Sequence, residues 1–347
     1  MDMVGSLNKV FDGFKIDAKC IGANKHRHFS FYDVELDPGC RISKIVRYSR
    51  EISIAMRVST DFIVKPIPEK GIIRLQTTNS AADVLHFETL YKRSLEKNGE
   101  PKGTLPLLIG ETDEGKAMWV DMAKCPHLLV AGSTGSGKSV FLHNLIANVS
   151  KRKDTKLFLV DTKKVEFGAY SKDLSFKRLI SYCATDYNSA YAMLRYLYGT
   201  METRYNILCD AGLNSIEENP NIFQKYLIVI DEASDLLLQR PDKEFETLLT
   251  RLAQMARAAG IYIVLATQRP SADVLTGLIK ANFPARLACK VTSKINSRVV
   301  LDCHGAESLA GRGDAIFKNS VVDHARLQIA YTEPKRIIDN FKLITLS

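Results

Sequence analysis

A glycine-rich segment containing one lysine is the strongest chemical signal in this chain. Gly132-Ser-Thr-Gly-Ser-Gly-Lys-Ser139 follows the apolar run His127–Ala131 and precedes the helical pattern Val140–Val149. Gly-x-x-x-x-Gly-Lys-Ser between a strand and a helix is typical of a phosphate-binding loop, whose backbone N–H groups surround the β-phosphate. Lys138 would reach the β- and γ-phosphates, and the Ser139 hydroxyl would ligate Mg²⁺. The predicted nucleotide-binding residues are Gly132, Ser133, Thr134, Gly135, Ser136, Gly137, Lys138, Ser139 and Val140.

Two adjacent acids supply the second half of the expected site. The apolar run Tyr226–Ile230 ends at Asp231 and Glu232. If this run is a parallel neighbour of the strand before the loop, both strand ends meet at one edge of the sheet. Asp231 then joins Ser139 in holding Mg²⁺, whereas Glu232 is the better candidate for polarising the attacking water, because hydrolysis needs a base near the γ-phosphate. Alternatively, the two acids cap a following helix.

A third polar strand end, Leu265–Arg269, carries Gln268. Its amide suits a catalytic sensor that contacts the γ-phosphate or the attacking water; a simple capped loop is the alternative. Asp161 and Lys163 likewise close a predicted strand, and Glu166 follows them. Their spacing does not assign them a role.

The elements that must position these residues follow an alternating pattern after about residue 106. Short apolar runs are separated by segments of helical length, of which Asn188–Leu208 and Lys243–Ala259 have apolar residues at three- and four-residue intervals. This alternation predicts an α/β fold with a mainly parallel sheet covered on both faces. The apolar runs are His127–Ala131, Leu157–Asp161, Tyr226–Asp231, Ile261–Thr267 and Arg286–Val291.

The first part of the chain lacks this alternation and predicts a smaller, separate α+β domain. The turn-rich stretch Asn98–Gly103 marks the boundary, so we expect domains at residues 1–106 and 107–334 and a short tail at 335–347. Within the first domain, Arg41, Lys44, Arg47 and Arg50 recur every three residues, as on an amphipathic helix. This basic helix is either a solvated face or a surface for a polyanionic partner.

Composition limits the classes of protein to which the chain can belong. Its 347 residues are 46% hydrophobic and 25% charged, which excludes a disordered or collagen-like chain. No apolar run approaches the roughly 18 residues of a membrane span, and the opening residues lack the layout of a signal peptide. Seven scattered cysteines without a Cys-x-x-Cys pair argue against a disulfide or zinc framework. We therefore expect a cytoplasmic protein without membrane insertion.

Positive charge is concentrated after the predicted catalytic strand. The formal net charge is +9, and Thr247–Leu301 contains eight basic residues but one acid, Asp273. Such a segment favours a surface that follows a phosphate backbone or reaches a neighbouring subunit's nucleotide, with a scattered solvated exterior as the alternative. Aromatic residues are sparse here, so contact with duplex DNA is favoured over base stacking.

Taken together, these motifs closely resemble the FtsK/SpoIIIE family of DNA translocases. The resemblance implies a RecA-like motor that forms a hexameric ring, hydrolyses ATP with Mg²⁺ and pumps double-stranded DNA through a central channel. It also implies that Arg257 is an arginine finger for the adjacent subunit's nucleotide, and that Arg269, Lys294, Arg298 and, less directly, Lys280 contact DNA. The matching blocks are His127–Ser139, Arg251–Gly260, Leu265–Pro270, Gly277–Asn282, Ser293–Arg298 and Gly305–Leu309.

The family's membrane-spanning and winged-helix segments have no counterpart in this sequence, so we expect a compact, soluble form of the motor. Two other functions share the same motifs. One is a coupling ATPase for conjugation or secretion, and the other is a nucleotide-gated DNA-binding accessory of replication or packaging.

Overall fold

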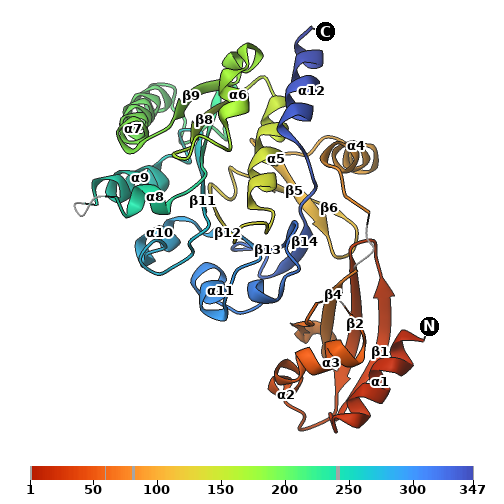
Figure 1. The fold of residues 1–347 in the computed structure, drawn as a ribbon. Helices are drawn as coiled ribbons and strands as arrows, with labels where there is room; N and C mark the ends of the chain where they lie inside the picture. The colour runs from red at the N-terminus through yellow and green to blue at the C-terminus, as the bar shows by residue number, and fades with distance from the viewer. Residues whose placement is uncertain (1, 59, 80–82, 240–242, 347) are drawn as a thin grey trace.

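The computed structural model describes residues 2–58, 60–79, 83–239 and 243–346. Positions 1, 59 and 80–82 of the predicted N-terminal domain, 240–242 of the predicted motor domain and 347 of the predicted tail lie outside the described residues. Within those ranges the strands form two separate sheets, a small one at the N-terminal end and a large one that occupies the rest of the chain (Figure 1).

The small sheet is antiparallel, with strand order β1-β2-β4-β3. β2 and β4 pair in register from Phe29↔Thr78 to Glu35↔Ile72, whereas the pairing of β1 with β2 shifts between Cys20 and Gly22. Short helices pack against one face of the sheet, around a core that includes Leu7, Ile52 and Leu75. The predicted basic helix is divided into two helices. Tyr48 interrupts it, because its φ of −95° and ψ of 11° are not helical. The elements are α1 (Met3–Gly13), β1 (Ala18–Lys25), β2 (Phe29–Leu36), α2 (Ile42–Arg47), α3 (Ser49–Ala55), β3 (Ile63–Ile67) and β4 (Ile72–Thr78).

The large sheet has ten strands among the described residues, in the order β6-β5-β14-β13-β12-β7-β11-β10-β8-β9. The six strands from β12 to β9 run parallel, and the other four are antiparallel. Its strands are β5 (Pro106–Thr112), β6 (Ala117–Asp121), β7 (His127–Ala131), β8 (Thr155–Val160), β9 (Ile180–Ala184), β10 (Lys225–Ile230), β11 (Ile261–Thr267), β12 (Ala285–Cys289), β13 (Asp314–Lys318) and β14 (Ala325–Gln328).

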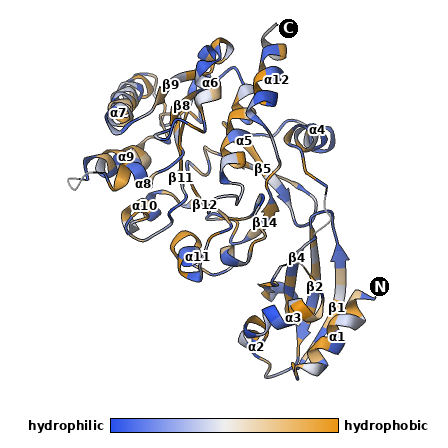
Figure 2. Ribbon diagram, in the orientation of Figure 1, coloured by the Kyte–Doolittle hydropathy of each residue, from blue (hydrophilic) through white to orange (hydrophobic). Residues whose placement is uncertain are grey.

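Helices cover both faces of this sheet, and many carry both hydrophobic and hydrophilic positions (Figure 2). On one face α4, α5, α6 and α12 contribute to a core that includes Phe87, Phe141 and Phe341; on the other, α7, α9, α10 and α11 contribute Leu194, Leu249 and Val300. The predicted α/β class with a mainly parallel sheet behind a smaller α+β unit is confirmed. The helices are α4 (Phe87–Asn98), α5 (Lys138–Ser150), α6 (Gly168–Lys172), α7 (Tyr187–Asp210), α8 (Ser234–Leu237), α9 (Glu244–Met255), α10 (Gly277–Asn282), α11 (Lys294–Leu301) and α12 (Pro334–Leu346).

The strand order corrects one sequence prediction. β7 and β10, expected as neighbours, are separated by β11, which pairs in parallel with both. All three strands still end at one edge, because parallel strands share their direction. One inserted strand adds only about 5 Å to the separation of the outer two, so the loop after β7 and the acids after β10 remain within reach of each other.

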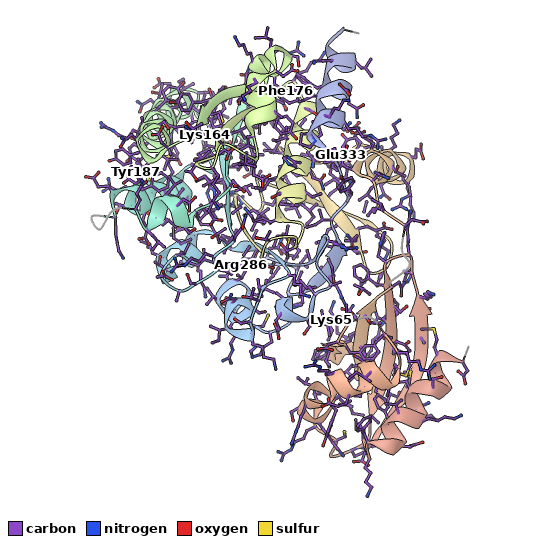
Figure 3. All side chains as sticks on the ribbon, in the orientation of Figure 1. Lys65, Lys164, Phe176, Tyr187, Arg286 and Glu333 are labelled. Atoms are coloured by element: carbon purple, nitrogen blue, oxygen red, sulfur yellow. The ribbon has the colours of Figure 1, made fainter. Side chains whose placement is uncertain are left out.

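The small sheet contacts the large one around β13 and β14. The buried Arg326 guanidinium binds Asp314 through two hydrogen bonds of 2.9 and 2.7 Å and lies over the Phe29 ring at 5.0 Å. Lys65, which Figure 3 labels at this junction, donates from Nζ to the His324 carbonyl oxygen at 2.9 Å. These contacts place the start of β2 and part of β3 next to the large sheet.

The boundaries 1–106, 107–334 and 335–347 stay predictions. Phe87 and Leu90 of α4 are buried in the same core as Leu107 of β5. Because α4 packs with the large sheet, we propose that the two units divide before Phe87. No helix in the described ranges is both long enough and apolar enough to cross a membrane.

Candidate nucleotide-binding site

A cavity of about 1020 Å³ lies at the edge of the large sheet where the parallel strands end. Its size suits a nucleotide, since ligand pockets are commonly about 300–1,000 Å³. Seven of the nine predicted loop residues line it: Ser133, Thr134, Gly135, Gly137, Lys138, Ser139 and Val140. Further lining residues include Glu166, Gln268 and Lys290, residues of β14 and of the turn before β13, and His28, Thr60, Thr78 and Asn79 of the small unit.

The loop owes its shape to backbone conformations that favour glycine. Gly135 and Gly137 have φ of 75° and 110°, and a Cβ on Gly137 would lie 2.5 Å from the backbone nitrogen of Gly313. Gly313 N–H donates to the Ser136 carbonyl oxygen at 2.8 Å, and Arg312 N–H donates to that of Gly135 at 3.2 Å. The backbone at Arg312 and Gly313 thus supports the loop from outside.

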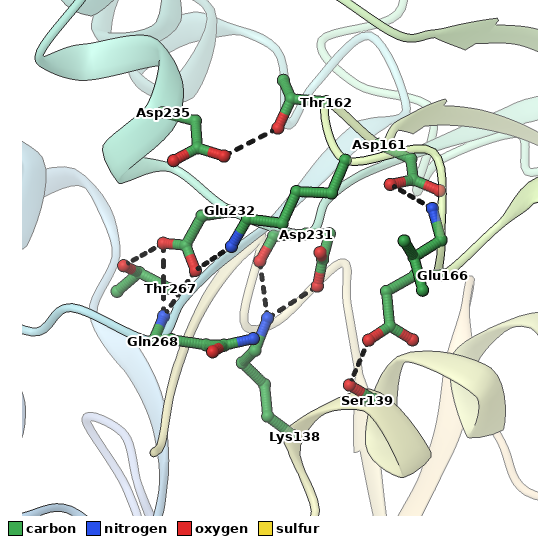
Figure 4. Close-up of polar contacts among 12 residues, drawn as sticks. Lys138, Ser139, Asp161, Thr162, Glu166, Asp231, Glu232, Asp235, Thr267 and Gln268 are labelled. Atoms are coloured by element: carbon green, nitrogen blue, oxygen red, sulfur yellow. Dashed lines mark hydrogen bonds and ion pairs between the residues drawn. The ribbon is translucent and has the colours of Figure 1, made fainter. Parts of the chain in front are cut away.

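Lys138 and Asp231 form an ion pair at the first turn of α5. Lys138 Nζ donates to an Asp231 carboxylate oxygen at 2.6 Å and to its carbonyl oxygen at 2.7 Å (Figure 4). Both side chains are 3% exposed. Burial raises the pKa of Asp231, opposed by Lys138 and reinforced by the nearby carboxylates of Glu166 and Glu232. The Lys138 ammonium is therefore the nearby positive charge that offsets the burial of the Asp231 carboxylate.

Ser139, in the same turn of α5 as Lys138, donates from Oγ to Glu166 Oε1 at 2.5 Å (Figure 4). Hydroxyl and carboxylate oxygens are the hard donors that Mg²⁺ prefers, and such sites usually combine one or two carboxylates with phosphate and water ligands. The residues present therefore fit a Mg²⁺ held through Ser139 and Asp231.

Glu232 is a buried carboxylate with an extensive set of donors. It accepts from Thr267 Oγ1 at 2.6 Å, from Ser234 Oγ at 2.8 Å and from the Gln268 backbone N–H at 2.9 Å, and Lys163 Nζ lies 3.9 Å away. A carboxylate accepts about four hydrogen bonds, so these three donors do not use the full acceptor capacity of Glu232. Thr134 Oγ1 donates to Gln268 Oε1 at 3.2 Å, so the loop, Gln268 and Glu232 meet in one place.

Arg257 lies at the opposite edge of the sheet. It precedes β11, whose last residue Thr267 pairs with Ala131 just before the loop. A seven-residue strand spans about 23 Å, so Arg257 cannot reach the cavity of its own chain. Its guanidinium is half-exposed and lies 3.0 Å from Glu217.

Lys294 and Arg298 occupy one exposed side of α11, four residues apart. Ser293 caps this helix, accepting at Oγ from Asn296 N–H at 3.1 Å. Ile295 beside them is 73% exposed, so this side of the helix is open. Arg269 is also exposed, with Asp273 3.4 Å away.

Other basic residues of the segment Thr247–Leu301 form ion pairs or line the nucleotide cavity. Lys280 Nζ lies 2.6 Å from Asp302, and Arg286 binds the same carboxylate, just beyond the predicted segment. Lys290 lines the nucleotide cavity, together with Arg312. The segment is therefore not a single surface, and Lys280 is the most constrained of the four predicted DNA contacts.

The structure assigns positions to residues whose roles the sequence left open. Asp161 is buried and accepts from the backbone N–H groups of Val165 and Phe167 at 3.2 and 2.8 Å, so it shapes the loop after β8. Lys163 and Glu166 from that loop reach Glu232 and Ser139. Their signal in the sequence was the polar end of the strand Leu157–Asp161, but the order of the strands in the sheet was needed to place them.

Comparison with known proteins identifies the family. The model of the FtsK/SpoIIIE family matches residues 91–226 and 217–272, and that of the FtsK alpha domain matches residues 1–79. The DNA translocase FtsK of Chlamydia muridarum (strain MoPn / Nigg) is 37% identical over 330 residues, covering 89% of this chain and 41% of that protein. The DNA translocase SpoIIIE of Bacillus subtilis (strain 168) is 35% identical over 328 residues, covering 90% and 41%.

The chain thus spans about two fifths of the length of these curated relatives. Among solved structures, the monomer form of the pCW3 conjugation coupling protein TcpA with ATPgS is similar, with a TM-score of 0.65 and 22% identity. The match covers 98% of this chain and 99% of that one. At this identity the likeness is one of fold, and it extends over both units.

Proposed function

Because the chain belongs to the FtsK/SpoIIIE family, we propose that it is an ATP-hydrolysing motor that moves double-stranded DNA. The convergence of the loop, Asp231, Glu232 and Gln268 at one sheet edge carries this proposal. The names of the relatives as DNA translocases support DNA as the substrate.

In the proposed reaction, Lys138 leaves Asp231 and binds the β- and γ-phosphates, while the loop N–H groups surround the β-phosphate. Ser139 and Asp231 hold Mg²⁺, which when bound neutralises charge on the phosphates. Glu232 accepts a proton from the attacking water, and Gln268, between Thr134 and Glu232, orients that water or the γ-phosphate. Thr267 and Ser234 keep Glu232 in place through their hydrogen bonds.

Arg257 requires a second copy of the chain to act on phosphate. Its distance from its own cavity supports a role as an arginine finger in trans, since a planar cation stabilises charge on the transferred phosphoryl group. We therefore propose a ring, with a hexamer as the expected size, in which nucleotides bind between neighbouring subunits. Lys294 and Arg298, with Arg269, then face the DNA, and Lys280 contributes only if it leaves Asp302.

DNA should stimulate ATP hydrolysis by the wild-type protein, and the stimulation should fall steeply with salt. A surface that neutralises about 6–10 phosphates loses about 10³–10⁵ in affinity between about 50 and 200 mM salt. ATPase rates measured with linear duplex DNA across that range test this expectation. Displacement of a third strand from the duplex, with and without ATP, then separates pumping from binding. Unchanged hydrolysis at low salt, or stimulation by a protein substrate alone, would contradict a DNA motor.

The double variant Lys294→Ala with Arg298→Ala should lose most of the DNA-stimulated hydrolysis. Each lost phosphate contact lowers the salt slope of DNA affinity by about 1, so the slope should fall by about 2. DNA binding measured by fluorescence anisotropy over a salt series gives the slope. The matched control is Lys92→Ala with Lys97→Ala, which removes the same charge from exposed positions of α4 and should keep the wild-type slope. Equal slopes for the two double variants would assign DNA contact to another surface.

A further inference from the structure

The loop between β8 and α6 is shaped so that Glu166 faces the first turn of α5. Asp161 holds the loop by accepting from the N–H groups of Val165 and Phe167, and Lys164 has a φ of 59°, a conformation that reverses the chain. Figure 4 shows Glu166 directed from this loop at Ser139, on the side of the site away from Glu232. The loop therefore places a carboxylate beside the proposed metal site.

Glu166 is held at both carboxylate oxygens. Oε1 accepts from Ser139 Oγ at 2.5 Å, and Oε2 lies 3.5 Å from His143 Nε2. Ser139 and His143 are four residues apart on α5, so both side chains project from one face of the helix. The buried Tyr170 hydroxyl lies 3.1 Å from His143 Nδ1. A phenol that donates to Nδ1 leaves the N–H of a neutral imidazole at Nε2, directed at Glu166.

A serine that ligates a cation needs an acceptor for its hydroxyl hydrogen, and Glu166 provides one for Ser139. A hydroxyl that gives a lone pair to a metal must direct its hydrogen to another acceptor, because a hydrogen pointing at the cation would be repelled. A carboxylate acceptor makes a short, charge-assisted hydrogen bond and increases electron density on the serine oxygen. Acceptors behind metal ligands in this way fix the orientation of the ligand and strengthen its bond to the metal.

We propose that Glu166 is a positioning residue for Mg²⁺, which accepts the Ser139 hydrogen so that the serine lone pair faces the cation. This inference rests on the proposed function and extends it to a residue outside the loop and the two acids after β10. His143 and Tyr170 support Glu166 from behind. Glu166 acts through Ser139, so its effect depends on that hydroxyl.

The test measures metal-dependent nucleotide binding rather than turnover. A fluorescent ATP analogue is titrated into wild type and Glu166→Gln at increasing Mg²⁺ and, separately, in EDTA. Glu166→Gln leaves a single, uncharged acceptor oxygen for the two donors Ser139 and His143, so the Mg²⁺ concentration at half-maximal binding should rise by about 10–100-fold. Affinity in EDTA and the temperature of thermal unfolding in EDTA should remain close to wild type. A loss of affinity in EDTA equal to the loss in Mg²⁺ would assign Glu166 a purely structural role and overturn the proposal.

The Ser139→Ala background tests whether Glu166 influences Mg²⁺ binding through the Ser139 hydroxyl. Glu166→Gln should produce no further change there, since the hydroxyl that it positions is gone. A full additional effect in that background would overturn the inference. Glu246→Gln is the matched control. Glu246 is also a buried glutamate that accepts a short hydrogen bond from a hydroxyl, that of Thr276 at 2.6 Å, but it does not line the cavity. This variant should retain the Mg²⁺ dependence of the wild type.

Failure of the two proposals can be distinguished. If wild type binds no nucleotide with or without Mg²⁺, the proposed function fails. If wild type binds with a clear Mg²⁺ dependence and Glu166→Gln behaves identically, the function stands and the role of Glu166 is wrong. Direct binding of Mn²⁺ to the nucleotide complex, followed by electron paramagnetic resonance of the free ion, should show the same weakening for Glu166→Gln.

Discussion

Lys138→Ala is expected to abolish ATP hydrolysis and to weaken nucleotide binding by at least about 100-fold, because the ammonium is the charged donor available to the β- and γ-phosphates in the loop. The change has a second effect, which follows from the ion pair. Removing the lysine leaves the Asp231 carboxylate buried without its partner, which typically destabilises a fold by about 3–5 kcal/mol unless the group protonates. Binding of a fluorescent ATP analogue and thermal unfolding should therefore be measured on the same samples.

Two variants separate the binding role of Lys138 from its structural role. Lys138→Ala with Asp231→Asn removes both charges, so it should recover stability without recovering nucleotide binding. Lys225→Ala is the matched control at the other end of β10. Lys225 is 2% exposed and lies 3.0 Å from Asp154, so its loss should also destabilise the fold, but nucleotide binding should survive in the folded fraction. Normal ATP binding by the stable double variant would contradict the assigned role.

Glu232→Gln is expected to keep ATP bound and to lower hydrolysis by about 10²–10⁴-fold, the usual contribution of a general base. The amide preserves the shape of the side chain but cannot accept a proton from water. Its oxygen can still accept from Thr267, from Ser234 and, at 3.2 Å, from the Gln268 N–H, whereas the 2.9 Å bond of that N–H to the second carboxylate oxygen is lost. Three of the contacts of the side chain thus persist. Single-turnover hydrolysis with bound ATP measures the chemical step, and a binding titration confirms that the nucleotide site is intact.

Glu246→Gln provides the comparison for this experiment as well. It replaces another buried glutamate, 8% exposed, that accepts from Thr276 rather than from Thr267 and Gln268, and it should hydrolyse ATP at the wild-type rate. Equal single-turnover rates for wild type and Glu232→Gln would remove Glu232 from the mechanism. Loss of ATP binding by Glu232→Gln would instead indicate that the side chain has a structural role. This is the alternative in which the two acids cap the following helix.

Local sequence patterns were sufficient for the main elements. The strands predicted at His127–Ala131 and Ile261–Thr267 have those bounds in the structure. The helix after the loop begins at Lys138, close to the predicted start at Val140. These features depend on short-range periodicity and on glycine conformations, which neighbouring residues decide.

Charge partners could not be predicted in the same way. Lys280 and Arg286 belong to a segment with a single acid, yet both bind Asp302, which follows it directly. Lys290 is in the same segment, and the end of β12 places it at the nucleotide cavity. Net charge along a sequence is a sum, whereas an ion pair depends on which side chains the fold brings together.

By itself, the sequence determined the family, the parallel α/β class and the residue types of the phosphate-binding loop, because each of these depends on residues that lie close together in the chain. Only the tertiary structure decided that β11 separates β7 from β10, that the small unit forms part of the cavity wall and that Glu166 meets Ser139. Those contacts join residues far apart in the chain. They depend on strand order and on packing between layers, which local periodicity does not specify.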